Sequence, residues 1–417
     1  MPWTIFFRPV NSDFSVVERS ESQKARLRLL SPFLPIPLGR PYFLLAVDTT
    51  PAPRPFARTL EDRQIVYQPN PAPGNNPVTV GHHFSTVVIL PEKAAQSPSW
   101  AIPLRIERIP SGETGTDMGI SQIEELMDDK ELPFHNKLTV DVADSSFSIA
   151  SFLGRACDID NLVTIVRSRG NRVFFRFPES STTQPSKGRP KCFGERFEMK
   201  NPHTWQDPDQ SIDHLHVRPS GNQVTIRVEV WNNLLMSGKR GIPMHHNPFS
   251  LIRIRMLNED GSPIFKKPLW LLVTGKRRDE IPLIDVWQCY RQRYDIEHFY
   301  RFGKRKLLLA SYQTPDVEHE GNWWEIAGLA YFQLWMARPL AESTPHPWER
   351  YAQQSPENSR SLGPSEVQKD FERIIRQYEL TLPPPKPRGK SPGRVHGYSP
   401  GRRKRHPIVF KGGEEAA

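Results

Sequence analysis

The order of the apolar segments between residues 41 and 169 most limits the folds open to this chain. Three runs typical of strands come first: "YFLLAV", "HHFSTVVILPE" and "AIPLRIERIP". A segment with helical spacing, "GISQIEELMDD", follows, and then a strand, a second helix and a last strand, "NLVTIVRSR". Strands in this order, with helices between the later ones, predict a mixed sheet with flanking helices, and so an α/β fold.

Residues 170–275 have a different pattern, with short β-rich runs separated by Pro, Ser and Gly turns. We interpret them as an all-β insertion into the α/β core. A helix is predicted to follow from about Pro282 to Phe302, with Asp285 as a cap near its start and Gly303 near its end. The expected regions are a short N-terminal region (1–40), the core (41–169 and 276–345), the insertion (170–275), a C-terminal helical segment (346–382) and a basic Pro/Gly-rich tail (383–417).

The formal net charge of +10 is concentrated in the tail. The stretch from Lys386 to Arg405 holds eight of the 56 Lys and Arg residues and no acid, and the remaining 48 nearly balance the 46 Asp and Glu. Such a segment lacks the apolar residues of a core, so we expect it to be flexible. Its charge suits nucleic-acid phosphates, and the alternative is a solubilising end.

The remaining composition indicates a globular protein of the cytoplasm. No apolar run reaches the length of a membrane span, and the first residues lack the pattern of a signal peptide. The three cysteines are widely spaced, which predicts neither a disulfide framework nor a zinc site. No phosphate-binding loop is present, so we expect no nucleotide cofactor.

Two acidic residues stand where predicted strands end. Asp48 ends the first strand and Asp144 ends the fourth. Ends of adjacent strands are where α/β sheets present their chemistry, and carboxylates there can hold hard divalent cations. Taken singly, Asp48 is also compatible with a turn and Asp144 with a helix cap. Strand alternation places Asp141 on the opposite face from Asp144.

The stretch "YRQRYDIEHFYRFGK" places four polar side chains on one helical face. With about 100° per residue, Tyr290, Arg293, Glu297 and Lys304 fall within one narrow sector, whereas Asp295 points away. One carboxylate is thus surrounded by a phenol, a guanidinium and an ammonium group. Ion pairs on a solvated helix face would give the same spacing.

The joint pattern resembles a group of bacterial insertion-sequence transposases. Their signature is Tyr, two residues, Arg, three residues, Glu, six residues and Lys, and this chain matches it at the four positions named above. The segments "AVDTTPAPRPFA", "VADSSFS" and "TPDVEHEGNWW" are also similar to this group. The resemblance runs from about Pro41 to Arg405 and implies the DDE superfamily with an RNase H-like fold.

The resemblance also implies roles for these residues. Asp48, Asp144 and Glu297 would be the catalytic residues and would bind two Mg²⁺ or Mn²⁺ ions. Tyr290, Arg293 and Lys304 would contact phosphates of double-stranded transposon-end DNA. The expected activity is metal-dependent hydrolysis and strand transfer by a homodimer on DNA, in the bacterial cytoplasm at the nucleoid.

One departure from the group concerns the N-terminus. Only 47 residues precede Asp48, fewer than the helical N-terminal domain of the group requires, so we expect a truncated copy. Two other functions therefore stay open: an RNase H-like nuclease that cuts without transposing, and an inactive DNA-binding remnant. The intact set of acids favours an active enzyme.

Several further residues are weaker candidates. Arg167, Arg169, Arg172 and Arg176 fit either a DNA groove or a solvated sheet edge. Trp323 and Trp324 fit core packing better than base stacking. His82 and His83 face opposite ways on a predicted strand and cannot chelate one ion together, and His214 and His216 share a face without a third ligand.

Overall fold

The protein is described from a computed structural model, which covers residues 16–68, 77–94, 97–178, 191–218, 220–343, 361–377, 396–397 and 401–410, with side chains from residue 21. The chain forms two compact units. The first comprises Met1–Thr50, Phe84–Ile109 and Glu113–Tyr300, and the second comprises Pro51–His83, Pro110–Gly112 and Arg301–Ala417. Three elements contribute residues to both units: β1 (Phe43–Pro53), β3 (Val78–Ile89) and α5 (Asp295–Lys306).

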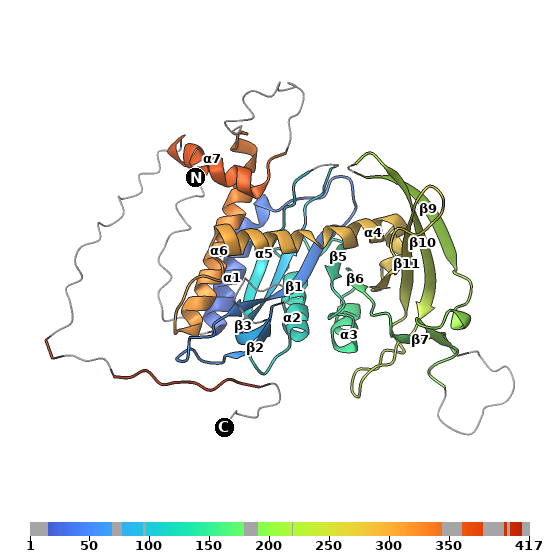
Figure 1. The fold of residues 1–417 in the computed structure, drawn as a ribbon, viewed down its shortest axis with the longest axis horizontal. Coiled ribbons are helices and arrows are strands. Elements are labelled where there is room, and N and C mark those ends of the chain that lie inside the picture. Colours follow the sequence, from blue (N-terminus) through green and yellow to red (C-terminus); the bar gives the residue numbers. More distant parts are fainter. Residues whose placement is uncertain are drawn as a thin grey trace. The chain divides into compact units, whose positions relative to one another are not determined.

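A large mixed sheet forms the centre of the first unit (Figure 1). Its strands lie in the order β3-β1-β5-β6-β12-β11-β10-β9, and β4 pairs with β3. β1, β5 and β6 are parallel, whereas β12, β11, β10 and β9 continue the sheet in antiparallel pairs. The bounds are β4 Ile102–Ile109, β5 Thr139–Ala143, β6 Leu162–Arg167, β9 Gln210–Val217, β10 Gln223–Leu234, β11 Phe249–Leu257 and β12 Leu269–Thr274.

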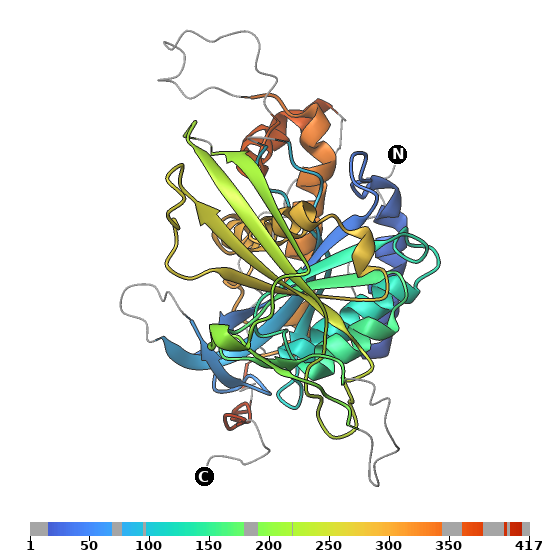
Figure 2. The ribbon, with the colours of Figure 1, turned by 90° about the vertical axis from the view of Figure 1, so that its right-hand side faces the viewer.

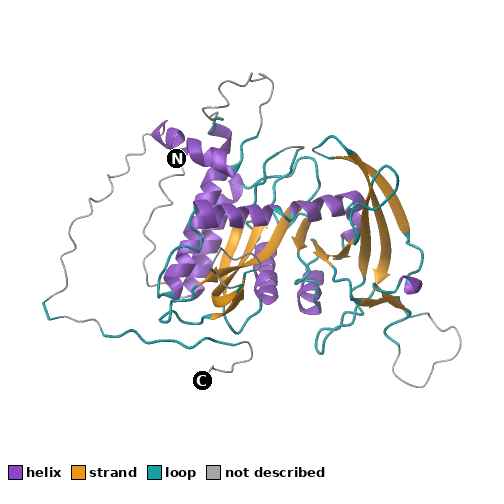
Figure 3. Ribbon diagram, viewed as in Figure 1, coloured by secondary structure: helices purple, strands orange, loops and turns teal. Residues whose placement is uncertain are grey.

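Helices cover both faces of the parallel strands. In Figure 3, α2 (Gly115–Asp128) and α3 (Ala150–Asp158) lie on one side of β5 and β6, and α4 (Leu283–Gln292) lies on the other. The packing of α2 is close, since a Cβ atom at Gly119 would lie 2.9 Å from Cγ2 of Val47. This mixed sheet with flanking helices confirms the predicted α/β class and is compatible with an RNase H-like fold.

The predicted insertion is rich in strands, but most of them extend the central sheet. β12 pairs with β6 through the register Leu271↔Arg167 to Thr274↔Thr164. The strands β9, β10 and β11, green to yellow in Figure 2, lie side by side beyond β12. A separate two-stranded sheet joins β7 (Val173–Phe175) to β8 (Arg196–Glu198).

The prediction of one continuous helix from Pro282 to Phe302 is wrong, because the structure has two helices there. α4 ends at Gln292 and α5 begins at Asp295, because the backbone tightens between them: Ile296 N donates to Arg293 O at 3.1 Å. Gly303 does not end the second helix, which runs to Lys306. The predicted cap is also wrong, since Pro282 holds the N-cap position and Asp285 accepts a hydrogen bond from the hydroxyl of Tyr42 at 3.1 Å.

The second unit is built on two helices and a short strand pair. β2 (Gln64–Tyr67) pairs antiparallel with Val78–Gly81 of β3. α6 (Val317–Ala337) packs against α7 (Pro364–Gln377). Asp316 caps α6 by accepting from the backbone N–H groups of Glu318 and His319. No described helix combines the length and apolar content needed to cross a membrane.

The remaining elements are short or lie at the ends of the chain. They are α1 (Val16–Leu30) and the 3₁₀ turns η2 (Ser31–Phe33), η3 (Pro202–Thr204), η4 (Arg278–Glu280) and η5 (Arg338–Leu340). Most of the tail that we expected to be flexible lies outside the described residues. The exceptions are residues 396–397 and 401–410, and in the latter the backbone N–H groups of His406 and Val409 donate to Arg58 O and Arg63 O.

Candidate functional site

The two predicted aspartates lie on one face of the sheet. The prediction that Asp48 ends its strand is wrong, because β1 continues past Asp48 to Pro53. In the parallel register of β1 with β5, Ala46 pairs with Val142, so alternation directs Asp48 and Asp144 to the same side. Asp144 follows the last residue of β5, and its Oδ1 accepts a hydrogen bond from Ser146 N at 2.7 Å. Asp141 pairs with Leu45 in this register and therefore lies on the opposite face, as predicted.

Arg293 links Asp48 to Glu297. Its Nη1 lies 3.6 Å from Oδ2 of Asp48, and its Nη2 lies 2.9 Å from Oε1 of Glu297. The tightened backbone between α4 and α5 places Arg293 at this junction, one turn before Glu297. The structure thus brings an acid of β1 and the acid of α5 to a single guanidinium group.

Burial is the main influence on the charge of Asp48. Burial raises the pKa of Asp48 to about 7, Asp144 and Glu297 push it in the same direction, and Arg293 opposes them. For Arg293, burial disfavours the charged form, but the carboxylates of Asp48 and Glu297 leave its pKa raised on balance. Arg293 therefore offsets the burial of Asp48 only in part.

Two tyrosines complete the surroundings of Asp48 and Arg293. Tyr290 is hydrogen-bonded to Arg293, and burial raises its pKa against the opposing effect of Arg293 and Arg167. Tyr300 donates its hydroxyl hydrogen to the backbone oxygen of Asp48 at 3.0 Å. Sequence reasoning missed Tyr300, because a tyrosine next to a phenylalanine on a helix is typical of core packing.

The two other charged residues of the motif have different partners. Asp295 is buried and pairs with Lys93, whose Nζ lies 3.2 Å from Oδ1, so it points away from Glu297 as predicted. Lys304 belongs to the second unit, where its Nζ donates to the backbone oxygen of Pro51 at 3.2 Å.

The carboxylates suit a divalent cation in their chemistry but not in their present arrangement. Oxygen ligands are those that Mg²⁺ prefers, and the raised pKa of Asp48 marks a place where added positive charge is favourable. Among the described residues, however, no group of three or more His, Cys, Asp and Glu side chains is arranged to hold a metal ion. The guanidinium of Arg293 pairs with two of the three acids, so it would have to move before ions could bind.

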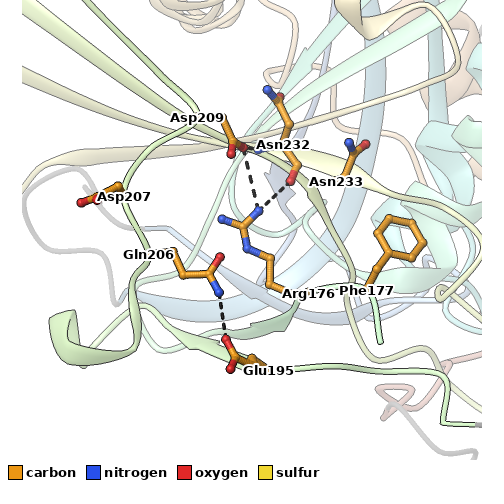
Figure 4. Close-up of a pocket in the computed structure, with 8 residues that line it drawn as sticks. All are labelled: Arg176, Phe177, Glu195, Gln206, Asp207, Asp209, Asn232 and Asn233. Atoms are coloured by element: carbon orange, nitrogen blue, oxygen red, sulfur yellow. Dashed lines mark hydrogen bonds and ion pairs between the residues drawn. The ribbon is translucent and has the colours of Figure 1, made fainter. Parts of the chain in front are cut away.

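The other predicted arginines do not line a common groove. Arg172 donates to the backbone oxygen of Ser148 at 2.8 Å, whereas Arg167 is exposed at the end of β6. Arg176 borders a polar pocket of about 570 Å³ in the β-rich region, where it donates to Asn232 O and lies 3.9 Å from Asp209 (Figure 4). The pocket is lined by Arg176, Phe177, Glu195, Gln206, Asp207, Asp209, Asn232 and Asn233.

The remaining candidates have structural partners. His82 is buried and contacts Glu320 and the backbone oxygen of Glu61. His216 packs edge-on against Trp287, with the ring centroids 5.1 Å apart. Trp324 is buried, and Trp323 stacks on Tyr312 at 5.2 Å between centroids, so core packing was the better prediction for Trp324.

Comparison with known proteins identifies the family from the first half of the chain. A profile described as DDE superfamily endonuclease matches residues 14–230. The chain belongs to this family. The matched range of this DDE superfamily endonuclease includes Asp48 and Asp144, and it ends before the helices that carry Tyr290, Arg293 and Glu297. A search of curated proteins gave no match. Membership in the family supports nuclease activity on DNA.

Proposed function

We propose that this chain is a DDE transposase, which cuts phosphodiester bonds at the ends of an insertion sequence and joins the freed ends to target DNA. The observation that carries the proposal is the meeting of Asp48 and Glu297 at Arg293, with Asp144 on the same face of the sheet. The family match adds independent support for action on DNA.

Asp48, Asp144 and Glu297 are the proposed ligands of two Mg²⁺ or Mn²⁺ ions, the metals that DDE superfamily enzymes generally use. Two bound ions would activate the attacking oxygen and stabilise the leaving oxygen of the phosphodiester. The chain's own contribution is to hold the three carboxylates at fixed places. The parallel strands β1 and β5 position the two aspartates, and α5 positions the glutamate.

Tyr290, Arg293 and Lys304 are the proposed phosphate contacts. A guanidinium can hold a phosphate through two parallel hydrogen bonds, whereas a lysine ammonium acts as a point charge. Arg293 would exchange its carboxylate partners for a phosphate when ions and DNA bind. Tyr300 is a positioning residue, because its hydroxyl holds the backbone of Asp48 rather than any reacting atom.

The test is cleavage and joining of DNA by the purified chain. A labelled duplex carrying the ends of the encoding element would be incubated with Mg²⁺ or Mn²⁺, with target plasmid present. Asp48→Asn, Asp144→Asn and Glu297→Gln should each abolish cutting while duplex binding persists. The exposed Asp158→Asn and Glu259→Gln are matched controls of the same chemistry and should cut normally. Cutting by Glu297→Gln at the wild-type rate would refute its role as a ligand.

The products separate the proposed function from its alternatives. Joining of the cut end to plasmid indicates a transposase, and cutting without joining indicates a nuclease. Binding without either reaction indicates an inactive remnant. We further propose that two copies act together on DNA, which light scattering of the DNA complex would test.

A further inference from the structure

Residues 401–410, which we call the C-terminal strap, belong to the second unit and are attached there beside β2. His406 N donates to Arg58 O at 2.9 Å, and Val409 N donates to Arg63 O at 2.7 Å. Val409 also forms a parallel bridge with Gln64, the first residue of β2. Backbone hydrogen bonds of this kind add an extended segment to the edge of a strand.

Two side chains reinforce this attachment. Nη2 of Arg63 donates to the backbone oxygen of His406 at 3.1 Å, and the imidazole of His406 lies 3.4 Å from the carboxylate of Glu61. Arg63 is itself buried, so the strap covers a polar group that would otherwise need another acceptor. These hydrogen bonds therefore define a specific register between the strap and the segment before β2.

Four cations directly precede the attachment. Arg402, Arg403, Lys404 and Arg405 are all exposed, and none of them has an ion pair among the described residues. An extended chain spans roughly 3.3–3.6 Å per residue, so all four charges stay within about 14 Å of His406. The strap thus keeps this basic quartet close to its attachment at His406, which differs from a charge run on a free tail.

The chemistry of the quartet fits a polyanion with closely spaced charges. It contains no acid and no apolar side chain that could recognise a peptide. Duplex DNA carries a negative charge about every 1.7 Å of its axis and so can meet four adjacent cations at once. We propose that the C-terminal strap is a strand-anchored clamp that holds the quartet Arg402–Arg405 against the phosphate backbone of duplex DNA.

The clamp rests on the proposed function for its choice of DNA as the polyanion. It contacts phosphates only, so it binds any sequence and contributes through counterion release. Its function depends on the anchor as well as on the charges, since attachment removes most of the freedom that a tail would lose on binding.

The experiment compares three full-length variants for binding to a random-sequence duplex at several salt concentrations. The first replaces Arg402, Arg403, Lys404 and Arg405 by Gln. The second, Val409→Pro, removes the N–H that Val409 donates and keeps every charge. The matched control replaces Lys386, Arg388, Lys390 and Arg394 by Gln, which removes the same charge from the same tail.

The quartet variant should lose about tenfold or more in affinity at low salt, and its salt slope should flatten by up to about 0.9 per lost phosphate contact. Val409→Pro should lose part of this affinity, and the control should lose least. Truncation after Arg405 provides a second anchor variant, because it retains the four charges. Equal losses in the quartet and control variants would overturn the clamp, as would wild-type binding by both anchor variants.

Two further measurements separate the clamp from the proposed function. If the wild-type chain binds DNA through the quartet but never cuts it, the transposase proposal fails and the clamp stands. If the wild type cuts DNA and the quartet variant binds and cuts normally, only the clamp fails. Binding of the quartet to phosphatidylserine vesicles in preference to duplex DNA would also refute the assignment.

Discussion

Arg293 donates a hydrogen bond to Glu297 across the junction of α4 and α5, with Nη2 2.9 Å from Oε1. The same guanidinium lies 3.6 Å from Asp48. An arginine between two proposed metal ligands acts as an internal counter-ion, which holds the carboxylates near each other without a metal. Binding of divalent ions would then compete with this arginine.

Replacing Arg293 by Gln should therefore change how the protein responds to Mg²⁺. Without divalent ions the variant should be less stable by roughly 1–3 kcal/mol, because Asp48 and Glu297 lose a charged hydrogen-bond partner. Added Mg²⁺ should raise its melting temperature more than that of the wild type. Differential scanning fluorimetry with and without Mg²⁺ measures both effects, and the exposed Arg305→Gln on the same helix is the control. If Mg²⁺ raised the melting temperatures of Arg293→Gln and Arg305→Gln by the same amount, Arg293 would not compete with the ions.

The face of each aspartate was predictable because the signal is local: the period of two assigns Asp141 to the face opposite Asp144. The end of the first strand was not, because β1 continues through the polar residues after Asp48 to Pro53, whereas the end of an apolar run alone indicates a strand end. The break between α4 and α5 was not predictable, since no Gly or Pro interrupts the helical pattern around Arg293. The role of Tyr300 was also hidden, because its partner is a backbone oxygen about 250 residues away in the sequence.

The extent of the sheet and the attachment of the strap could not be predicted from the sequence, because both depend on contacts between segments far apart along the chain. Local patterns gave the strands of the predicted insertion, but not the pairing of Leu271 with Arg167 that joins them to the core sheet. The composition of the tail predicted charge without order. The attachment of Val409 uses the outer edge of β2 at Gln64, which only the fold reveals.

Asp141 should make the stability of the protein depend on pH. It is fully buried, no cation pairs with it among the described residues, and burial raises its pKa to about 8. The folded state holds the proton of Asp141 more tightly than the unfolded state does. The contribution of Asp141 to the free energy of unfolding should therefore be fully present below about pH 4 and should be lost as pH rises to about 8. Between pH 5 and 9 the wild type should lose roughly a few kcal/mol of unfolding free energy from this group, and Asp141→Asn should lose most of this pH dependence. Urea unfolding at both pH values tests this, with Asp158→Asn as the exposed control, and an unchanged slope in Asp141→Asn would contradict it.

Glu320 should be essential for the stability of the second unit. Its carboxylate is fully buried and pairs with Arg54 at 2.7 Å and with His82. Removing one member of a buried ionic group leaves the other charge without compensation, which typically costs about 3–5 kcal/mol. Glu320→Gln should therefore unfold at lower urea concentration than the wild type, whereas the exposed control Glu372→Gln in α7 should differ little from the wild type. A loss of less than about 1 kcal/mol would mean that the backbone acceptors of Arg54, Ala310 O and Tyr312 O, are sufficient.

Two arginine–carboxylate pairs in the β-rich region offer a matched test of how burial sets the strength of an ion pair. Arg253 of β11 donates two hydrogen bonds to Glu229 of β10, at 2.6 and 2.7 Å, and Arg227 of β10 donates two to Asp213 of β9, at 2.7 Å each. The geometry is the same, but the first pair is only 17% and 9% exposed, against 39% and 47% for the second.

The buried pair also has an aromatic setting. The guanidinium of Arg253 lies 5.0, 5.5 and 5.7 Å from the ring centroids of Trp205, Trp231 and Trp270. Such contacts add stabilisation when the cation is removed from water. Arg253 therefore fills the centre of the tryptophan cluster as well as neutralising Glu229.

Arg253→Met should destabilise the protein by about 3–5 kcal/mol, because Glu229 would lose its two hydrogen bonds from Arg253 and keep the longer ion pair with Arg255, at 3.3 Å. Arg227→Met should cost only about 0.2–1 kcal/mol, as exposed pairs do. The double replacement of Arg253 and Glu229 by Met should recover part of the loss, since no charge is then left buried and unpaired. Urea unfolding followed by tryptophan fluorescence measures all three variants, and the fluorescence spectrum of the folded state should shift only when Arg253 is replaced. Equal costs for the two single variants would show that burial does not decide the strength of these pairs.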